Sequence, residues 1–92
     1  MSEASREVTV VNTRGLHARA SAKFVNLATQ LDSKIEVEKD GNRVVGTSIM
    51  GLMMLGAAKG DSILIHVEGG HAEESLKLLV HLVESGFDEE CG

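Results

Sequence analysis

Aromatic residues are nearly absent from this sequence of 92 residues, which has no tryptophan, no tyrosine and only two phenylalanines. The chain therefore lacks the stacking platforms on which single-stranded nucleic acids bind. Its formal net charge of −5 also argues against sequence-independent binding to nucleic acid or to an anionic membrane surface. We expect no nucleic acid among the partners.

Cysteine is equally scarce, because Cys91 is the only one. An internal disulfide or a CxxC metal pair is excluded, and a reducing compartment is expected. No apolar run reaches the roughly 20 residues that a membrane span requires, and the polar start "MSEASREV" is unlike a signal peptide. We therefore expect a cytoplasmic protein without membrane insertion, bound metal or cofactor.

Proline is also missing, so glycine and aspartate mark the turns between elements. The apolar periodicity predicts the order βαββαβα, an α+β open-faced β-sandwich in which a four-stranded, mostly antiparallel sheet carries three helices on one face. One domain is expected over 1–92, with an ordered core at about 6–87, a short polar N-terminal tail and an acidic C-terminal tail. The expected elements are a strand at 6–12, a helix at 18–31, a hairpin at 34–46, a short helix within 47–61, a strand at 62–68 and a helix at 72–85.

The stretch "NTRGLHARASAKF", residues 12–24, places a histidine between a glycine turn and an amphipathic helix. His17 falls at the N-cap or in the first turn, where unpaired backbone N–H groups and the helix dipole attract anions. A phosphate there would accept hydrogen bonds from the amides of about Ala18 to Ala20, and Arg19 would add a forked partner. The positive helix end also favours an uncharged imidazole, the form that acts as a nucleophile.

A histidine at a helix start is often only a polar surface residue, and the same position suits a carboxylate as well as a phosphate. No second base, acid or metal-ligand cluster accompanies His17 in a recognisable motif. We therefore expect a partner enzyme to supply the catalysis. Gly15 is expected to let the loop expose the His17 ring. The other histidines, His66, His71 and His81, are expected to be structural.

The segment "TSIMGLMMLGAAKGD", residues 47–61, is apolar almost all round, whereas a surface helix normally has a polar face. Its three methionines cannot all enter one small core, so some should form an exposed, adaptable contact surface. The alternative is that they are ordinary core filler. Ser48 or Thr47 is the N-cap candidate before the apolar run, and capping is the commoner role of a serine there. The methionines are Met50, Met53 and Met54.

Together, "GLHARASAKF" and "TSIMGLMMLGAAKGD" resemble the HPr family, the histidine-containing phosphocarriers of the bacterial phosphoenolpyruvate-dependent phosphotransferase system, over residues 6 to about 87. The resemblance implies the βαββαβα fold. It also implies that His17 accepts a phosphoryl group at Nδ1 from a phosphoenolpyruvate-charged enzyme of the enzyme I type and donates it to a histidine on a downstream acceptor domain. Arg19 would lie beside the phosphohistidine, and Ser48 would be the regulatory site of a serine kinase/phosphorylase.

The resemblance further implies one docking surface that meets the charging enzyme and the acceptors in turn. One departure is visible, because the family's usual "HARPA" has proline where this chain has Ala20, which frees one amide and loosens the first turn. We expect a monomeric carrier that is an intermediate in phosphoryl transfer rather than a stand-alone enzyme. The expected docking residues are Ile49, Met50 and Met53 in the short helix and Ala22, Lys23 and Asn26 in the first helix.

Other functions are also compatible with the sequence. A carrier of the nitrogen-related regulatory branch would present the same residues as a carrier for sugar uptake. A small-ligand-binding regulatory module of this size would carry no phosphate on His17. A histidine phosphatase is disfavoured, since "RGLHAR" lacks a companion catalytic set and 92 residues leave little room for a substrate cavity.

Overall fold

Four strands and three helices alternate along residues 2–88, the part of the chain that the computed structural model describes. Their order, βαββαβα, confirms the prediction. The expected acidic tail and Cys91 fall at or beyond the end of the described residues. The elements are β1 (Ser2–Thr9), α1 (Ala18–Gln30), β2 (Ser33–Lys39), β3 (Asn42–Val45), α2 (Ile49–Met54), β4 (Ser62–Gly69) and α3 (Ala72–Glu84).

The first strand differs from its predicted bounds of 6–12 at both ends. β1 begins at Ser2 and ends at Thr9, so the residues expected to form a polar tail belong to the sheet. Ser2 pairs with Gly69 and Ser5 with His66, because backbone hydrogen bonds to β4 do not depend on apolar side chains. The prediction was wrong here because it followed the apolar alternation, which starts only at Val8.

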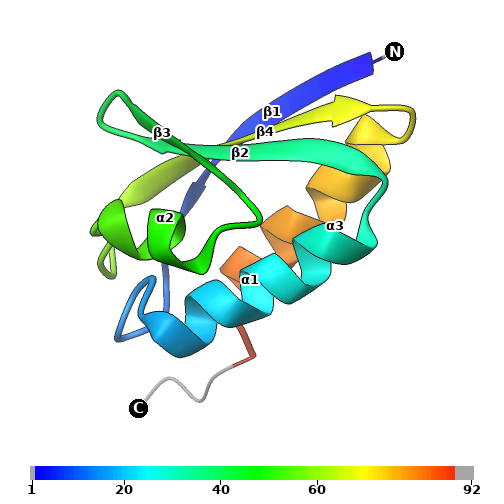
Figure 1. The fold of residues 1–92 in the computed structure, drawn as a ribbon. Helices are drawn as coiled ribbons and strands as arrows, with labels where there is room; N and C mark the ends of the chain where they lie inside the picture. The colour runs from blue at the N-terminus through cyan, green and yellow to red at the C-terminus, as the bar shows by residue number, and fades with distance from the viewer. Residues whose placement is uncertain (1, 89–92) are drawn as a thin grey trace.

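The sheet has the strand order β1-β4-β2-β3, and each neighbouring pair is antiparallel. The predicted "mostly antiparallel" sheet is therefore antiparallel throughout. Figure 1 shows all three helices beneath this sheet, with α2 close to the N-terminal half of α1. The opposite face of the sheet is left open, which confirms the open-faced architecture.

The core lies between the sheet and the helices. Val8, Ile35 and Val37 alternate with polar residues along their strands, so their side chains share the inner face. Phe24 of α1 is completely buried, as is Phe87 just after α3. α1 and α3 each bury an apolar stripe against the sheet. This packing fixes the position of the start of α1. The helical stripes comprise Ala20, Phe24 and Ala28 in α1 and Ala72, Leu76, Leu79, Val80 and Val83 in α3.

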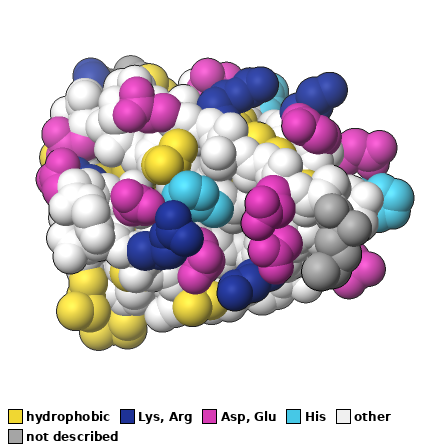
Figure 2. All heavy atoms as spheres, turned by 90° about the horizontal axis from the view of Figure 1, so that it is seen from above, with side chains coloured by type: hydrophobic (Ala, Val, Ile, Leu, Met, Phe, Trp, Pro, Cys, Tyr) yellow, Lys and Arg dark blue, Asp and Glu magenta, His cyan; other side chains and the backbone are white. Residues whose placement is uncertain are grey.

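A cluster of charged and polar side chains occupies the open face, where Figure 2 shows acidic, basic and histidine side chains side by side. Arg43 Nη2 lies 3.0 Å from Glu38 Oε1, and Arg43 Nη1 lies 3.4 Å from Glu36 Oε1. His66 Nε2 lies 3.2 Å from the same oxygen of Glu38. Three neighbouring strands are therefore joined by side-chain contacts as well as by the backbone, and His66 has a structural role in them.

Glu38 makes the stability of the fold sensitive to acid. Its hydrogen bonds to Arg43 and then His66 hold the pKa of its carboxyl below the usual 4.5. A depressed pKa stabilises the fold above pH 4.5, and this contribution is lost as the pH falls through the lower, folded-state value. We therefore expect Glu38→Gln to flatten the loss of stability below pH 4.5, measured as urea midpoints from pH 7 to pH 3. Glu84→Gln, at an exposed position on α3, is the control and should leave the slope as in the wild type.

Candidate functional site

The loop before α1 is held against the segment that follows α2. Asn12 Nδ2 donates to Gly15 O at 2.8 Å, and Leu16 N donates to Ala57 O at 2.9 Å. Gly15 has φ +62°, and a Cβ at this position would lie 2.3 Å from Ala57 O and 2.8 Å from Ala58 Cα. Only glycine fits such an approach. Gly15, which is expected to expose His17, thus allows its loop to pack closely against Ala57 and Ala58.

His17 is the N-cap residue of α1, one of the two positions that the sequence allows for it. Its backbone is extended, with φ −74° and ψ 179°, and its carbonyl oxygen accepts the first helical hydrogen bond, from Ser21 N at 2.9 Å. The ring itself supplies the cap, because Nδ1 accepts a hydrogen bond from Arg19 N at 3.3 Å. The half-buried imidazole therefore turns Nδ1, with its lone pair, toward the first amides of the helix.

The start of α1 is suited to an anion. Ala18, Arg19 and Ala20 precede the first helical hydrogen bond, so their N–H groups lie at the positive end of the helix dipole. No acidic residue occupies the first turn of α1. The side chain of Ala20 is fully buried, so this residue offers only its backbone, whereas Ala18 and Arg19 are exposed. A phosphoryl group on Nδ1 would thus meet backbone donors and the Arg19 guanidinium.

The short helix α2 presents its methionines to solvent. Met50 is 68% exposed, Met53 39% and Met54 80%, while Leu52 is fully buried and anchors the helix. We call the exposed apolar residues of this region the α2 surface; they are Val45, Ile49, Met50, Met53 and Met54.

Two residues of the α2 surface, Val45 and Met54, are missing from the docking residues expected from the sequence. Met54 was detectable, because it lies four residues after Met50 and so shares a helix face with it, opposite the buried Leu52. Val45 gave no such signal, since a valine in a predicted strand usually points inward. Here it ends β3 at the edge of the sheet, where its partner across the ladder is Glu36.

Ser48, one of the two N-cap candidates in the sequence, caps α2. Its Oγ accepts a hydrogen bond from Gly51 N at 3.0 Å, and its carbonyl oxygen accepts from Leu52 N at 3.0 Å. The hydroxyl is partly exposed and directly precedes Ile49, which is 39% exposed. A group added to this oxygen would therefore lie at the margin of the α2 surface.

The expected docking residues of α1 are not equivalent. Asn26 is exposed and Ala22 is half-buried, and the packing of α1 against α2 brings both helices to one side of the molecule (Figure 1). Lys23 differs, because its Nζ donates to Phe87 O at 2.7 Å. Its ammonium group is thus held by the turn after α3, a contact between distant parts of the chain that the sequence did not reveal.

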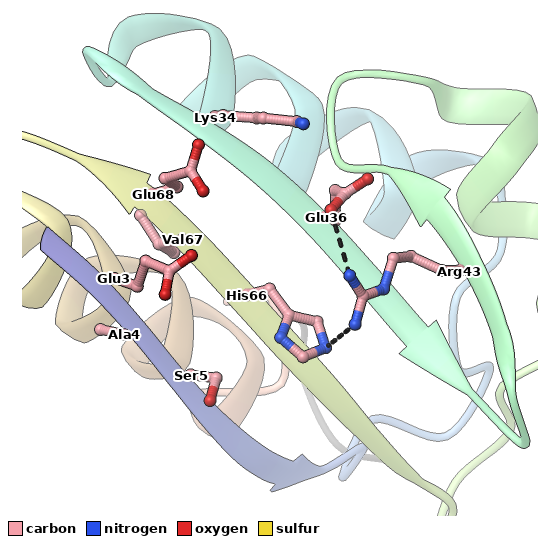
Figure 3. Close-up of a pocket in the computed structure, with 9 residues that line it drawn as sticks. All are labelled: Glu3, Ala4, Ser5, Lys34, Glu36, Arg43, His66, Val67 and Glu68. Atoms are coloured by element: carbon pink, nitrogen blue, oxygen red, sulfur yellow. Dashed lines mark hydrogen bonds and ion pairs between the residues drawn. The ribbon is translucent and has the colours of Figure 1, made fainter. Parts of the chain in front are cut away.

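A hollow of about 490 Å³ lies on the open face of the sheet, with residues of β1, β2, β3 and β4 around it. Figure 3 shows Arg43 placed between Glu36 and His66 in this hollow, so its guanidinium group contacts both side chains. His17 is not among the lining residues, because α1 packs on the other face. The candidate phosphoryl site is thus part of the exposed surface beside α2 rather than of this hollow.

The described residues contain no helix long and apolar enough to cross a membrane. Between residues 2 and 88, no group of three or more His, Cys, Asp or Glu residues gathers as metal ligands would.

The imidazole of His17 caps α1, and the exposed apolar helix α2 packs against α1. This arrangement is typical of a small protein that holds an anion at its surface and docks onto other proteins. A family model described as "PTS HPr component phosphorylation site" matches residues 4–85. The phosphocarrier protein HPr of Pseudomonas aeruginosa is 44% identical over 84 residues, which cover 90% of this chain and 93% of the relative. This chain therefore belongs to the HPr family of phosphocarrier proteins of the phosphotransferase system.

A solved structure and a second type of relative extend the comparison. HPr from Thermoanaerobacter tengcongensis superposes with a TM-score of 0.87 at 44% identity, covering 98% of this chain and 99% of that one. The phosphocarrier protein NPr of Shewanella violacea is 35% identical over 89 residues, which cover 97% of this chain and 98% of the relative. The fold and the family are thus supported along nearly the whole chain.

Proposed function

We propose that this protein carries a phosphoryl group on Nδ1 of His17 between a phosphoenolpyruvate-dependent charging enzyme and a histidine on a downstream acceptor domain. The observation that carries the proposal is the position of Nδ1, 3.3 Å from the amide nitrogen of Arg19 at the start of α1. The same nitrogen that must attack phosphorus already faces the donors that would bind the product. Membership of the HPr family supports this role.

The transfer replaces one interaction of the ring with another. The lone pair of Nδ1 forms a bond to phosphorus while the nitrogen–phosphorus bond to the histidine of the charging enzyme breaks. The hydrogen bond from Arg19 N to Nδ1 is lost, and that amide becomes a donor to a phosphoryl oxygen. Ala18 and Ala20 add further amides, and the Arg19 side chain adds a positive charge. No second acid or base accompanies His17 in a recognisable motif, so the partner enzymes are expected to supply the remaining catalysis.

The α2 surface docks the partners, together with Ala22, Asn26 and the stem of Lys23 on α1. Methionine side chains adapt to surfaces of different shape, which suits a carrier that must meet a donor and an acceptor in turn. The protein is expected to act as a monomer in the cytoplasm, where both kinds of partner would meet it.

Ser48 is proposed as the regulatory site of a serine kinase/phosphorylase. A phosphate on Oγ adds about −1.5 to −2 charges beside the α2 surface, and a docked partner would have to desolvate them. The start of α2 accommodates that charge, so partner binding weakens while the fold persists.

Substitutions of Ser48 should separate its capping role from the effect of charge. Ser48→Ala removes the acceptor for Gly51 N and should lower the free energy of unfolding by about 0.5–2 kcal/mol, measured by urea denaturation. Ser48→Asn and Ser48→Asp both keep a capping acceptor, and only the second adds charge. We expect the Asp variant to accept phosphate on His17 more slowly than the Asn variant, and equal rates would contradict the regulatory role.

The direct test incubates the protein with phosphoenolpyruvate and the family's charging enzyme, and then maps the phosphate by mass spectrometry. The expected product carries one acid-labile phosphate on His17. An acid-stable ester, or phosphate on His66, His71 or His81, would refute the assigned site. No phosphate at all would favour a ligand-binding module.

A second function has one observation in its favour. The similarity to NPr over nearly the whole chain is consistent with a carrier of the nitrogen-related regulatory branch. Competition between charging enzymes of the sugar-uptake and nitrogen-related branches, compared as kcat/KM for this protein, would distinguish the two roles.

A further inference from the structure

All three methionines among the described residues lie on one short helix. Met50 is 68% exposed and Met54 80%, whereas Met53 is 39% exposed. Met50 and Met54 are four residues apart and so share one face of α2. Buried methionines fill gaps in a core, but these two leave most of their surface to solvent and to any small oxidant dissolved in it.

We propose that Met50 and Met54 are oxidation sites, and that their conversion to methionine sulfoxide by hydrogen peroxide weakens docking of the phosphotransfer partners. The inference rests on the proposed docking role of the α2 surface. In each reaction, a lone pair of the thioether sulfur attacks one peroxide oxygen and the O–O bond breaks. The sulfur gains that oxygen and is oxidised by two electrons, while the other oxygen leaves as water with both hydrogens.

Methionine sulfoxide makes the α2 surface more polar and leaves the buried core unchanged, because Met50 and Met54 are exposed. A sulfoxide oxygen is a strong hydrogen-bond acceptor, and burying it against an apolar partner without a donor is unfavourable. Leu52, the anchor of α2, is fully buried and carries no sulfur, and the cap between Ser48 Oγ and Gly51 N is unaffected. Oxidation therefore acts on docking rather than on folding. Sulfoxide reductases reverse the reaction, so the change is suited to regulation.

The experiment treats the whole protein with hydrogen peroxide, maps the sulfoxides by mass spectrometry, and measures the initial rate of charging at a protein concentration below KM. We expect Met54 and Met50 to be oxidised faster than Met53, in keeping with their exposure. The charging rate should fall about tenfold, the effect of roughly one unsatisfied buried acceptor. A methionine sulfoxide reductase should restore it. Circular dichroism melting of the oxidised protein should match that of the untreated protein.

Matched variants show which methionines are responsible for the loss of charging rate. The rate of each variant is compared before and after peroxide treatment. The double variant M50L/M54L keeps apolar side chains of similar volume without the thioethers, so its rate should change by less than about twofold on treatment. M53L should stay as sensitive as the wild type. Full oxidation of Met50 and Met54 with an unchanged charging rate would overturn the inference while leaving the proposed function intact, as would equal sensitivity of M50L/M54L. If the untreated protein accepts no phosphate on His17, the proposed function fails and the inference falls with it.

Discussion

Replacing His17 by asparagine is expected to abolish phosphate acceptance from the charging enzyme while the fold remains intact. The asparagine amide has no nucleophilic nitrogen. Its oxygen can still accept the hydrogen bond that Arg19 N donates to Nδ1 in the native chain. Phosphorylation measured by intact mass after incubation with phosphoenolpyruvate should fall below detection.

The capping role of the ring is the reason for choosing asparagine rather than alanine alone. His17→Ala removes the acceptor as well as the nucleophile, so it should also lower the free energy of unfolding, by about 1 kcal/mol or less because the native bond is 3.3 Å long. We expect both variants to lose phosphorylation and only the Ala variant to lose stability. This result would distinguish the role of His17 as phosphate acceptor from its role as helix cap. Residual phosphorylation of His17→Asn would show that another residue accepts phosphate.

The substitution Gly15→Ala is expected to damage both stability and phosphoryl transfer. The new Cβ would lie 2.3 Å from Ala57 O, at a φ of +62° that alanine rarely adopts, so the loop must move. We expect a loss of about 1–3 kcal/mol in the free energy of unfolding. A displacement of about 1 Å in the His17 ring would slow charging by about a hundredfold. Urea denaturation and initial rates of charging measure the two effects.

The control for this prediction is Gly41→Ala in the turn between β2 and β3. Gly41 also has a positive φ, +83°, but a Cβ there meets nothing within 4 Å. This variant should lose about 1–2 kcal/mol through the left-handed backbone alone and charge at the rate of the wild type. Similar charging rates for Gly15→Ala and Gly41→Ala would mean that contact with Ala57 does not position His17.

The sequence predicts elements well where apolar periodicity and capping agree. α1 and α3 begin at their expected residues, 18 and 72, and each ends one residue before its expected end. His17 and Ser48 are the caps because each offers a side-chain acceptor just before a helix. β1 was misplaced at both ends for the opposite reason. Its first residues are polar, and only the pairing of Ser2 with Gly69 shows that they belong to the sheet.

Long-range contacts are the part of the site that the sequence cannot supply. The Lys23 ammonium is bound to Phe87 O, 64 positions away, and the loop of Gly15 rests on Ala57. Neither contact follows from spacing, because both depend on how α1, α2 and α3 pack. The exposure of Val45 likewise depends on the position of β3 at the edge of the sheet.

The central claim is that main-chain donors at the start of α1 bind the phosphoryl group carried by His17. Proton–nitrogen NMR spectra of the uniformly labelled protein, before and after charging, test it most directly. The amide protons of Ala18, Arg19 and Ala20 should show the largest downfield shifts in the chain, together with a phosphorus resonance typical of an Nδ1-linked phosphohistidine. Phosphorylation of His17 with those three amides unmoved would contradict the account.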